Sequence, residues 1–259
     1  MSKIEFRDVS FSYKEHNDSV MILDNMDLVV EEGEFVCLIG PSGCGKSTLI
    51  SLLSGLQFPT SGQVLIDGKP VTGPDVNRAM VFQHYSLFPW LTAKQNVMFG
   101  IREAGVLRNK REIQERAMDY LDRVGLAESA DKYPYELSGG MQQRVALARA
   151  FAMDTDILLM DEPFGAIDPL KRQELQELSL QLCKNSNKKK TIIFITHDID
   201  EALILADKVY FMEPKHIRRE VSVDLTKNVS REELVRTSRY NELRQEFLDL
   251  FSELRRATA

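Results

Sequence analysis

The sequence contains no long hydrophobic segment. Its longest strictly apolar runs are five residues each, Phe35–Ile39 and residues 202–206, whereas a membrane-spanning helix needs about 20. The uncharged stretch 47–66 is interrupted by Ser, Thr, Gln, Gly and Pro. The first residues lack an apolar core and carry an acid at position 5, so we expect no transmembrane segment and neither a signal nor a transit peptide.

Cysteines are also few, and basic residues do not predominate. The 259 residues include 3 cysteines, too few for a disulfide framework and typical of a reducing compartment. Acidic residues outnumber basic ones by 39 to 33, which disfavours binding to a nucleic-acid duplex. Neither a repeat of 20–50 residues nor a low-complexity segment occurs. Composition alone therefore predicts a soluble cytosolic protein with one large or two modest domains.

The apolar pattern predicts an α/β fold with a helical insert. Short apolar segments indicate strands at residues 3–9, 26–30, 35–39, 63–66, 79–82, 157–160, 192–195 and 208–212. Helical spacing dominates about residues 88–152, with Thr92 and Asn109 as N-caps. We predict a cassette over 1–220, made of a core at about 1–87 and 153–220 around this insert. A helical tail follows at 221–259, beginning with a capping-box pattern at Ser230 and Glu233.

Residues 40–48, GPSGCGKST, match the phosphate-binding pattern G-x-x-x-x-G-K-[ST]. Its glycines let successive backbone N–H groups point into one concavity, and the helix that begins there adds positive potential. Lys46 supplies a cation for the β- and γ-phosphates, and the Ser47 hydroxyl can bind Mg²⁺. An apolar strand before the loop and an amphipathic helix after it provide the required context. The residues expected to bind the nucleotide here are Gly40, Pro41, Ser42, Gly43, Cys44, Gly45, Lys46, Ser47 and Thr48.

Two acidic residues follow a second buried strand. Residues 157–160 are apolar and lead directly into Asp161 and Glu162, at the end of the strand where open α/β sheets bind ligands. Asp161 is suited to holding Mg²⁺, and Glu162 to orienting and polarising a water as a general base. Alone, the pattern could also be a strand end that caps a helix, but after a phosphate loop it indicates a catalytic pair.

A third segment, residues 137–144 (LSGGMQQR), predicts a helix start with an exposed backbone. Ser138 is a natural N-cap, and Gly139 and Gly140 leave N–H groups uncovered, which favours a second anion site. The alternative is a simple helix cap. A cap needs only the serine, however, and each glycine costs about 1 kcal/mol against alanine in a helix.

These motifs, in this order and spacing, resemble those of ATP-binding cassette (ABC) ATPases over about the first 215 residues. Gln83, Asp168 and His197 complete the set. The resemblance implies a P-loop NTPase (RecA-like) core with an N-terminal antiparallel β subdomain and an inserted α-helical subdomain. Segments 82–92, 160–168 and 195–202 look like those of the ATPase subunits of nitrate/sulfonate/taurine-type importers.

The resemblance also implies individual roles. Tyr13 would stack on adenine, although ordinary packing at a strand end is the alternative. Gln83 would reach toward Mg²⁺ and the attacking water, and His197 would contact the γ-phosphate. Asp168 would mediate communication in a dimer as well as cap a helix. The cysteine within the phosphate loop suggests sensitivity to thiol reagents.

By the same resemblance, two chains would enclose two ATP molecules. Ser138, Gly139, Gly140 and Gln142 of one chain would contact the ATP that residues 40–48 of the other chain bind. The expected catalytic residues are Glu162, His197, Gln83 and Lys46, and the expected Mg²⁺ ligands are Ser47, Gln83 and Asp161. The paired ATPase subunit could be an identical or a different chain.

The function expected from this resemblance is ATP hydrolysis that energises import of a small solute. A separate transmembrane permease would be contacted through residues 83–90, at the cytoplasmic face of the membrane, and a solute-binding protein would act indirectly. A non-transport or exporter-type ABC ATPase is the alternative. DNA-repair types need a coiled-coil or zinc insert, ribosome-acting types need two phosphate loops, and GTPases need an Asn-Lys-x-Asp motif; none of these occurs. The sequence does not identify the solute.

Overall fold

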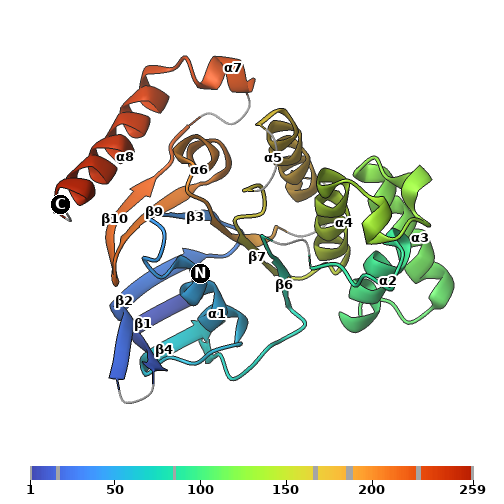
Figure 1. The fold of residues 1–259 in the computed structure, drawn as a ribbon, viewed down its shortest axis with the longest axis horizontal. Coiled ribbons are helices and arrows are strands. Elements are labelled where there is room, and N and C mark those ends of the chain that lie inside the picture. The colour runs from blue at the N-terminus through green and yellow to red at the C-terminus, as the bar shows by residue number, and fades with distance from the viewer. Residues whose placement is uncertain are drawn as a thin grey trace. The chain divides into compact units, whose positions relative to one another are not determined.

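A computed structural model describes residues 2–15, 18–83, 86–165, 169–184, 189–225 and 229–257. The chain divides into two compact units (Figure 1). The first unit contains residues 1–73 and 191–259, and the second contains residues 74–190. The predicted functional boundaries at 87/88, 152/153 and 220/221 are a different division and stay a prediction.

The first unit contains an antiparallel sheet with the strand order β2-β1-β4-β5. The strands are β1 (Ser2–Glu15), β2 (Asp18–Glu31), β4 (Ser61–Ile66) and β5 (Lys69–Pro70). Alternate residues Met26, Leu28 and Val30 are buried, which is the pattern that predicts the strand at 26–30. The strand begins eight residues earlier than predicted. Residues 18–21 pair with β1, but all four are exposed, so they lack the alternation of buried and exposed positions that indicates a strand.

The same unit contains the strands that lead to the phosphate loop. β3 (Phe35–Ile39) pairs in parallel with β8 (Thr191–Ile195) and with β9 (Lys208–Glu213), and every residue of β3 and β8 is buried. The helices are α1 (Lys46–Ser54), α6 (Ile199–Leu205), α7 (Arg231–Leu234) and α8 (Ser238–Ala257). The strand predicted at 208–212 is present as β9, and one further strand that was not predicted, β10 (His216–Ser222), pairs antiparallel with it.

The second unit is mostly helical. β6 (Arg78–Val81) and β7 (Ile157–Asp161) pair in parallel. The helices are α2 (Ala93–Glu103), α3 (Lys110–Arg123), α4 (Gly139–Ala152) and α5 (Pro169–Lys184), with short 3₁₀ turns at Ala127–Ser129 and Pro134–Glu136. α2, α3 and α4 pack against one another.

The predicted helix caps at Thr92, Asn109 and Ser230 are confirmed. Thr92 and Gln95 form a reciprocal capping box at the start of α2, and the Asn109 side chain accepts a hydrogen bond from the backbone N–H of Arg111 at α3. Ser230 begins α7 with the expected capping box. No helix within the described ranges is both long and apolar enough to cross a membrane.

Candidate functional site

The phosphate loop connects β3 directly to α1. Its backbone requires glycine at two positions because other atoms approach closely. A Cβ atom at Gly40 would lie 2.3 Å from the carbonyl oxygen of Met212, and one at Gly45 would lie 2.6 Å from Cδ2 of Leu23. Gly45 also has a φ of 108°, a left-handed conformation that favours glycine. The loop is therefore fixed against β9 and β2 of the first unit.

Lys46 lies over this loop. Its side chain is buried, and Nζ donates to the carbonyl oxygens of Gly40 at 2.8 Å and Pro41 at 2.9 Å. Cys44 is also buried, and burial raises the pKa of its thiol. Because reactive cysteines are exposed and have a low pKa, this arrangement disfavours the expected sensitivity to thiol reagents.

The acidic pair lies at the end of β7 in the second unit. Asp161 is the last residue of this strand, and Glu162 adopts a φ of 44°, a conformation that is uncommon for residues other than glycine and often found at functional sites. A Cβ atom at Gly165 would lie 3.5 Å from Oε2 of Glu162 and 3.6 Å from Nε2 of Gln83. The fold thus brings Gln83 and Glu162, the predicted water-orienting residues, to one point.

The predicted cation ligands have suitable chemistry for Mg²⁺. Ser47, Gln83 and Asp161 offer a hydroxyl, an amide carbonyl and a carboxylate oxygen, and hard oxygen donors are what Mg²⁺ prefers. No cluster of three His, Cys, Asp or Glu side chains suited to a metal occurs among the residues that the structure describes. A cation would therefore take its remaining ligands from water and from the phosphates of a bound nucleotide, as Mg²⁺ commonly does.

His197 lies between β8 and α6 in the first unit, with an exposed side chain. The residues on either side of it are hydrogen-bonded. The Asp198 N–H donates to Oγ1 of Thr196 at 3.0 Å, and that hydroxyl donates to the Glu201 carboxylate. The Asp198 side chain accepts from the N–H groups of Asp200 and Glu201 at the start of α6. The imidazole is therefore presented to solvent from a fixed backbone.

Tyr13 is available for stacking. Its side chain is 40% exposed, its ring contacts Phe11 edge-on at 4.9 Å, and its hydroxyl forms a 3.2 Å hydrogen bond with Gln57. The contact with Phe11 and the hydrogen bond to Gln57 restrain the position of the ring.

At Gly140, near the start of α4, local packing does not require a glycine. Ser138 is the N-cap, and its Oγ accepts from the Met141 N–H at 3.4 Å. The nearest atom to a Cβ at Gly140 would be Cδ of Lys171 at 3.6 Å, an ordinary contact, so a side chain would fit. Gln142 is turned toward its own loop, where Nε2 donates to the carbonyl oxygen of Leu137 at 3.1 Å. Asp168 lies outside the described residues.

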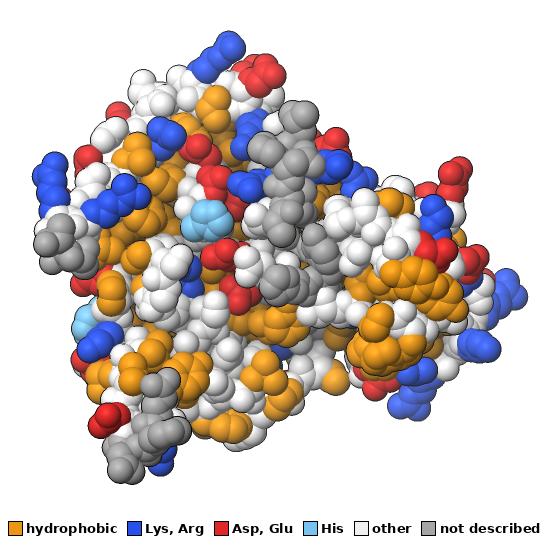
Figure 2. Space-filling view, viewed as in Figure 1, with side chains coloured by type: hydrophobic (Ala, Val, Ile, Leu, Met, Phe, Trp, Pro, Cys, Tyr) orange, Lys and Arg blue, Asp and Glu red, His pale blue; other side chains and the backbone are white. Residues whose placement is uncertain are grey.

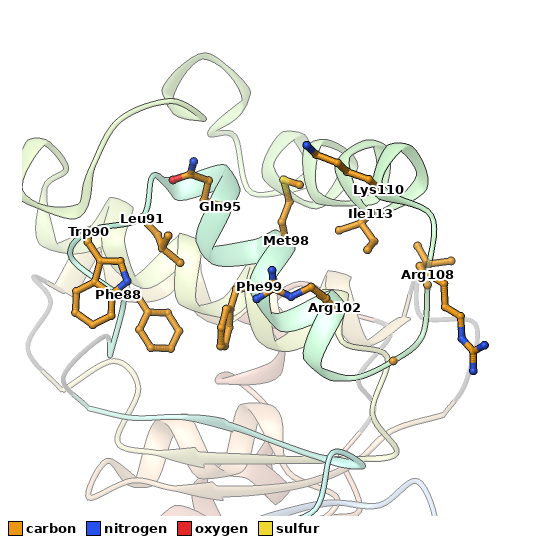
Figure 3. A pocket seen from close by; sticks show the side chains of 12 residues that line it. Phe88, Trp90, Leu91, Gln95, Met98, Phe99, Arg102, Arg108, Lys110 and Ile113 are labelled. Carbon is orange, nitrogen blue, oxygen red and sulfur yellow. The ribbon is translucent and has the colours of Figure 1, made fainter.

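The second unit also contains a groove that sequence reasoning did not find. It has a volume of about 930 Å³ and runs along α2, where Figure 2 shows hydrophobic side chains gathered over the helices α2 and α3. Figure 3 shows Phe88, Trp90 and Phe99 at one end and Arg108 and Lys110 at the other. Trp90, 69% exposed, belongs to the predicted permease-contacting segment 83–90.

Asn96 fixes the loop that carries these aromatic side chains. It is fully buried, and its Nδ2 donates to the carbonyl oxygens of Phe88 at 3.2 Å and Leu91 at 3.0 Å. Its Oδ1 accepts from the Phe88 N–H at 2.9 Å. The Phe88 ring in turn lies 5.6 Å from Trp90 and 4.6 Å from Phe99, so the aromatic end of the groove is a pre-formed surface.

Arg149 connects this loop to α4. Its Nη1 donates to the carbonyl oxygen of Ser86 at 2.9 Å, and its guanidinium lies 5.8 Å from the centre of the Phe88 ring. Burial lowers the pKa of Arg149. Because α4 begins at Ser138 and Gly139, this one side chain links the groove to the helix that carries the glycine pair.

Comparison with known proteins gives consistent matches. The family described as ABC transporter matches residues 23–165. The nitrate import ATP-binding protein NrtD of Synechocystis is 46% identical over 224 residues, 86% of this chain and 83% of that protein. The bicarbonate transport ATP-binding protein CmpD of Synechocystis is 41% identical over 249 residues, 95% and 88% of the two chains. The dimeric post-hydrolysis structure of the ATP-binding cassette MJ0796 with ADP and Pi superposes with a TM-score of 0.76 at 32% identity, over 85% of this chain and 98% of that one.

Proposed function

The chain belongs to the ABC transporter family of ATP-binding cassettes, and on that premise we propose that it hydrolyses ATP to energise import of a small solute through a separate permease. The relatives named for nitrate and bicarbonate import favour a small inorganic or organic anion of the nitrate/sulfonate/taurine class as the solute. They also favour import over the exporter and non-transport alternatives.

ATP binding is assigned to the phosphate loop. Backbone N–H groups of residues 42–48 surround the phosphates, and Lys46 leaves the carbonyl oxygens of Gly40 and Pro41 to contact the β- and γ-phosphates. Tyr13 stacks on the adenine through its exposed ring. Ser47, Gln83 and Asp161 would hold Mg²⁺, which would supply positive charge to the phosphates.

Hydrolysis is assigned to an in-line attack of water on the γ-phosphorus. Glu162 accepts a hydrogen bond from the water and polarises it, with Gln83 beside it as a second orienting group. His197 donates a hydrogen bond to the γ-phosphate from the fixed segment between Thr196 and Asp198. Lys46 stabilises the charge that develops on the phosphoryl oxygens.

A dimer completes the proposed site. Ser138, Gly139 and Gly140 of one subunit contact the γ-phosphate bound by the other. This contact explains a glycine at position 140, where local packing would accept a side chain, because a glycine leaves the backbone N–H open to the phosphate. ATP then bridges two chains while ADP does not, so the closed state is favoured before hydrolysis. Asp168 is proposed to communicate between the two sites.

The observation that carries the proposal of a permease partner is the groove along α2. Its volume of about 930 Å³ is lined by aromatic and apolar side chains at one end and by the exposed cations Arg108 and Lys110 at the other. Such a surface fits a short amphipathic helix. We expect the permease segment to place an apolar side chain against Trp90 and an acidic side chain near Arg108, at the cytoplasmic face of the membrane. A solute-binding protein acts indirectly.

The experiment is the variant Trp90→Ala in the assembled transporter. We expect loss of copurification with the permease and loss of coupled transport, while the isolated subunit still binds ATP. Phe58→Ala is the matched control, because Phe58 is an exposed aromatic residue of the first unit, 54% accessible and outside the groove. Intact coupled transport in Trp90→Ala would refute the assignment of the groove.

A further inference from the structure

The C-terminal helix α8 makes two hydrogen bonds to one carboxylate oxygen of α6. The Tyr240 hydroxyl donates to Oδ1 of Asp200 at 2.7 Å, and Nε of Arg244 donates to the same atom at 2.8 Å. Tyr240 and Arg244 lie one helical turn apart on α8 and therefore share a face. Both contacts lie within the first unit.

Asp200 lies three residues after His197 in the chain. Its backbone N–H is bound by the Asp198 side chain at 2.9 Å, and Asp198 is in turn bound to Thr196. Hydrogen bonds thus run without interruption from α8 through Asp200 and Asp198 to both neighbours of His197. A shift of the first turn of α6 would move the segment that carries the imidazole.

The same helix also packs on β9. Phe247, fully buried, and Phe251 lie 6.5 Å and 4.9 Å from the Phe211 ring. The next residue of β9, Met212, is the one whose carbonyl oxygen lies against Gly40. Figure 1 shows α8, in red, beside β10 and α6. α8 therefore contacts the elements that hold both the phosphate loop and His197.

A helix that only covered an apolar surface would need the ring of Tyr240 but not its hydroxyl. Tyr240 is 3% exposed, so its hydroxyl is shielded from water and hydrogen-bonds to Asp200 instead. Arg244 adds a charged donor to the same oxygen. Two donors directed at one atom add a directional restraint on the first turn of α6 to the apolar packing.

We propose that Tyr240 and Arg244 are positioning residues that hold His197 in the orientation needed for hydrolysis, so that the C-terminal helix sets the rate of the chemical step. This inference rests on the proposed role of His197. The kcat for ATP should fall when these contacts are removed, while ATP binding by residues 40–48 should change little.

The test uses the full chain with the double substitution Tyr240→Phe and Arg244→Met, which keeps the aromatic ring and an unbranched side chain but removes both donors to Asp200. We expect kcat to fall about three- to tenfold, as for residues that modulate a distant site, with KM for ATP within about twofold and the melting temperature within about 4 °C of the wild type. Arg244→Lys, which keeps a charged donor, should recover part of kcat. Glu246→Gln is the control, since its partner is Arg219 on β10, and it should leave kcat unchanged.

An unchanged kcat in the double variant would overturn the inference, and so would a loss of kcat matched by an equal loss in Glu246→Gln. A large fall in melting temperature together with a rise in the KM for ATP would assign α8 a purely structural role. His197→Ala separates this inference from the proposed function. If that variant keeps the wild-type kcat, the role of His197 itself is wrong. If it loses kcat while the α8 double variant does not, only the positioning role fails.

Discussion

The ammonium group of Lys46, the first residue of α1, lies 2.8 Å from the carbonyl oxygen of Gly40, the first residue of the phosphate loop. This hydrogen bond closes the loop on itself. In the proposed nucleotide-bound state, Lys46 exchanges these carbonyl oxygens for the phosphate oxygens of ATP.

Replacing Lys46 by alanine should weaken ATP binding at least about tenfold, because a charge-assisted contact to phosphate is lost. Titration with a fluorescent ATP analogue measures this directly. Lys69→Ala, which removes an exposed lysine of β5, is the control and should bind as the wild type does. Equal affinities for the two variants would show that residues 40–48 do not form the phosphate site.

Asn96→Ala should reduce the free energy of unfolding by about 2–4 kcal/mol, because it removes a fully buried side chain and leaves backbone groups of Phe88 and Leu91 without their partner. Urea unfolding followed by circular dichroism measures the change. Gln95→Ala is the comparison, since it loses only one capping contact and should cost about 1 kcal/mol. A cost for Asn96→Ala below that of Gln95→Ala would contradict the role of Asn96.

Arg149→Met keeps an unbranched apolar stem but removes the guanidinium, and with it the hydrogen bond to Ser86 and the contact with the Phe88 ring. We expect stimulation of ATP hydrolysis by the reconstituted permease to fall by about fivefold or more, with ATP affinity within about twofold of the wild type. Arg111→Met, at an exposed ion pair on α3, is the control. Full stimulation in Arg149→Met would mean that the groove and α4 are not linked through this side chain.

Alkaline pH should destabilise the protein through Tyr210. Burial raises the pKa of this phenol to about 12 from an ordinary value of 10, and its hydroxyl donates to the carbonyl oxygen of Val29 at 2.8 Å. Because the folded-state pKa is raised, the contribution is fully present below pH 10 and is lost as pH rises from 10 to 12, by up to about 2 kcal/mol.

Urea unfolding at several pH values measures this dependence. Tyr210→Phe cannot ionise, so its stability should decline less steeply than that of the wild type above pH 10, although it begins about 1 kcal/mol lower at pH 8 because the hydrogen bond to Val29 is lost. Parallel declines for the two proteins would show that Tyr210 does not contribute to the alkaline transition.

Local signals predicted much of the fold correctly. β3, β7 and β8 are short continuous apolar runs because both of their faces are covered, and such runs are visible without any knowledge of partners. The caps Thr92, Asn109 and Ser138 are equally local, since the side chain and the N–H it accepts from are two or three residues apart.

Features that depend on distant partners escaped prediction. β10 carries His216, Arg218 and Arg219 and has few apolar residues, and it forms because β9 offers it a pairing edge. α6 spans seven residues, too few to show a helical period. Asn96 looks like an ordinary helix residue in sequence, and its role depends on a loop that returns to it in space. The site motifs were recognisable because their spacing is fixed by phosphate chemistry, whereas the groove is defined by side chains scattered over residues 88–113.

We propose that this chain hydrolyses ATP with Glu162, between two subunits that ATP holds together. Light scattering coupled to size exclusion for Glu162→Gln at saturating ATP, with turnover measured on the same sample, tests both parts of this proposal. We expect ATP binding to be retained, turnover to fall about 100-fold or more, and a dimer that forms with ATP and dissociates with ADP. A monomer at saturating ATP, or a turnover equal to that of the wild type, would contradict it.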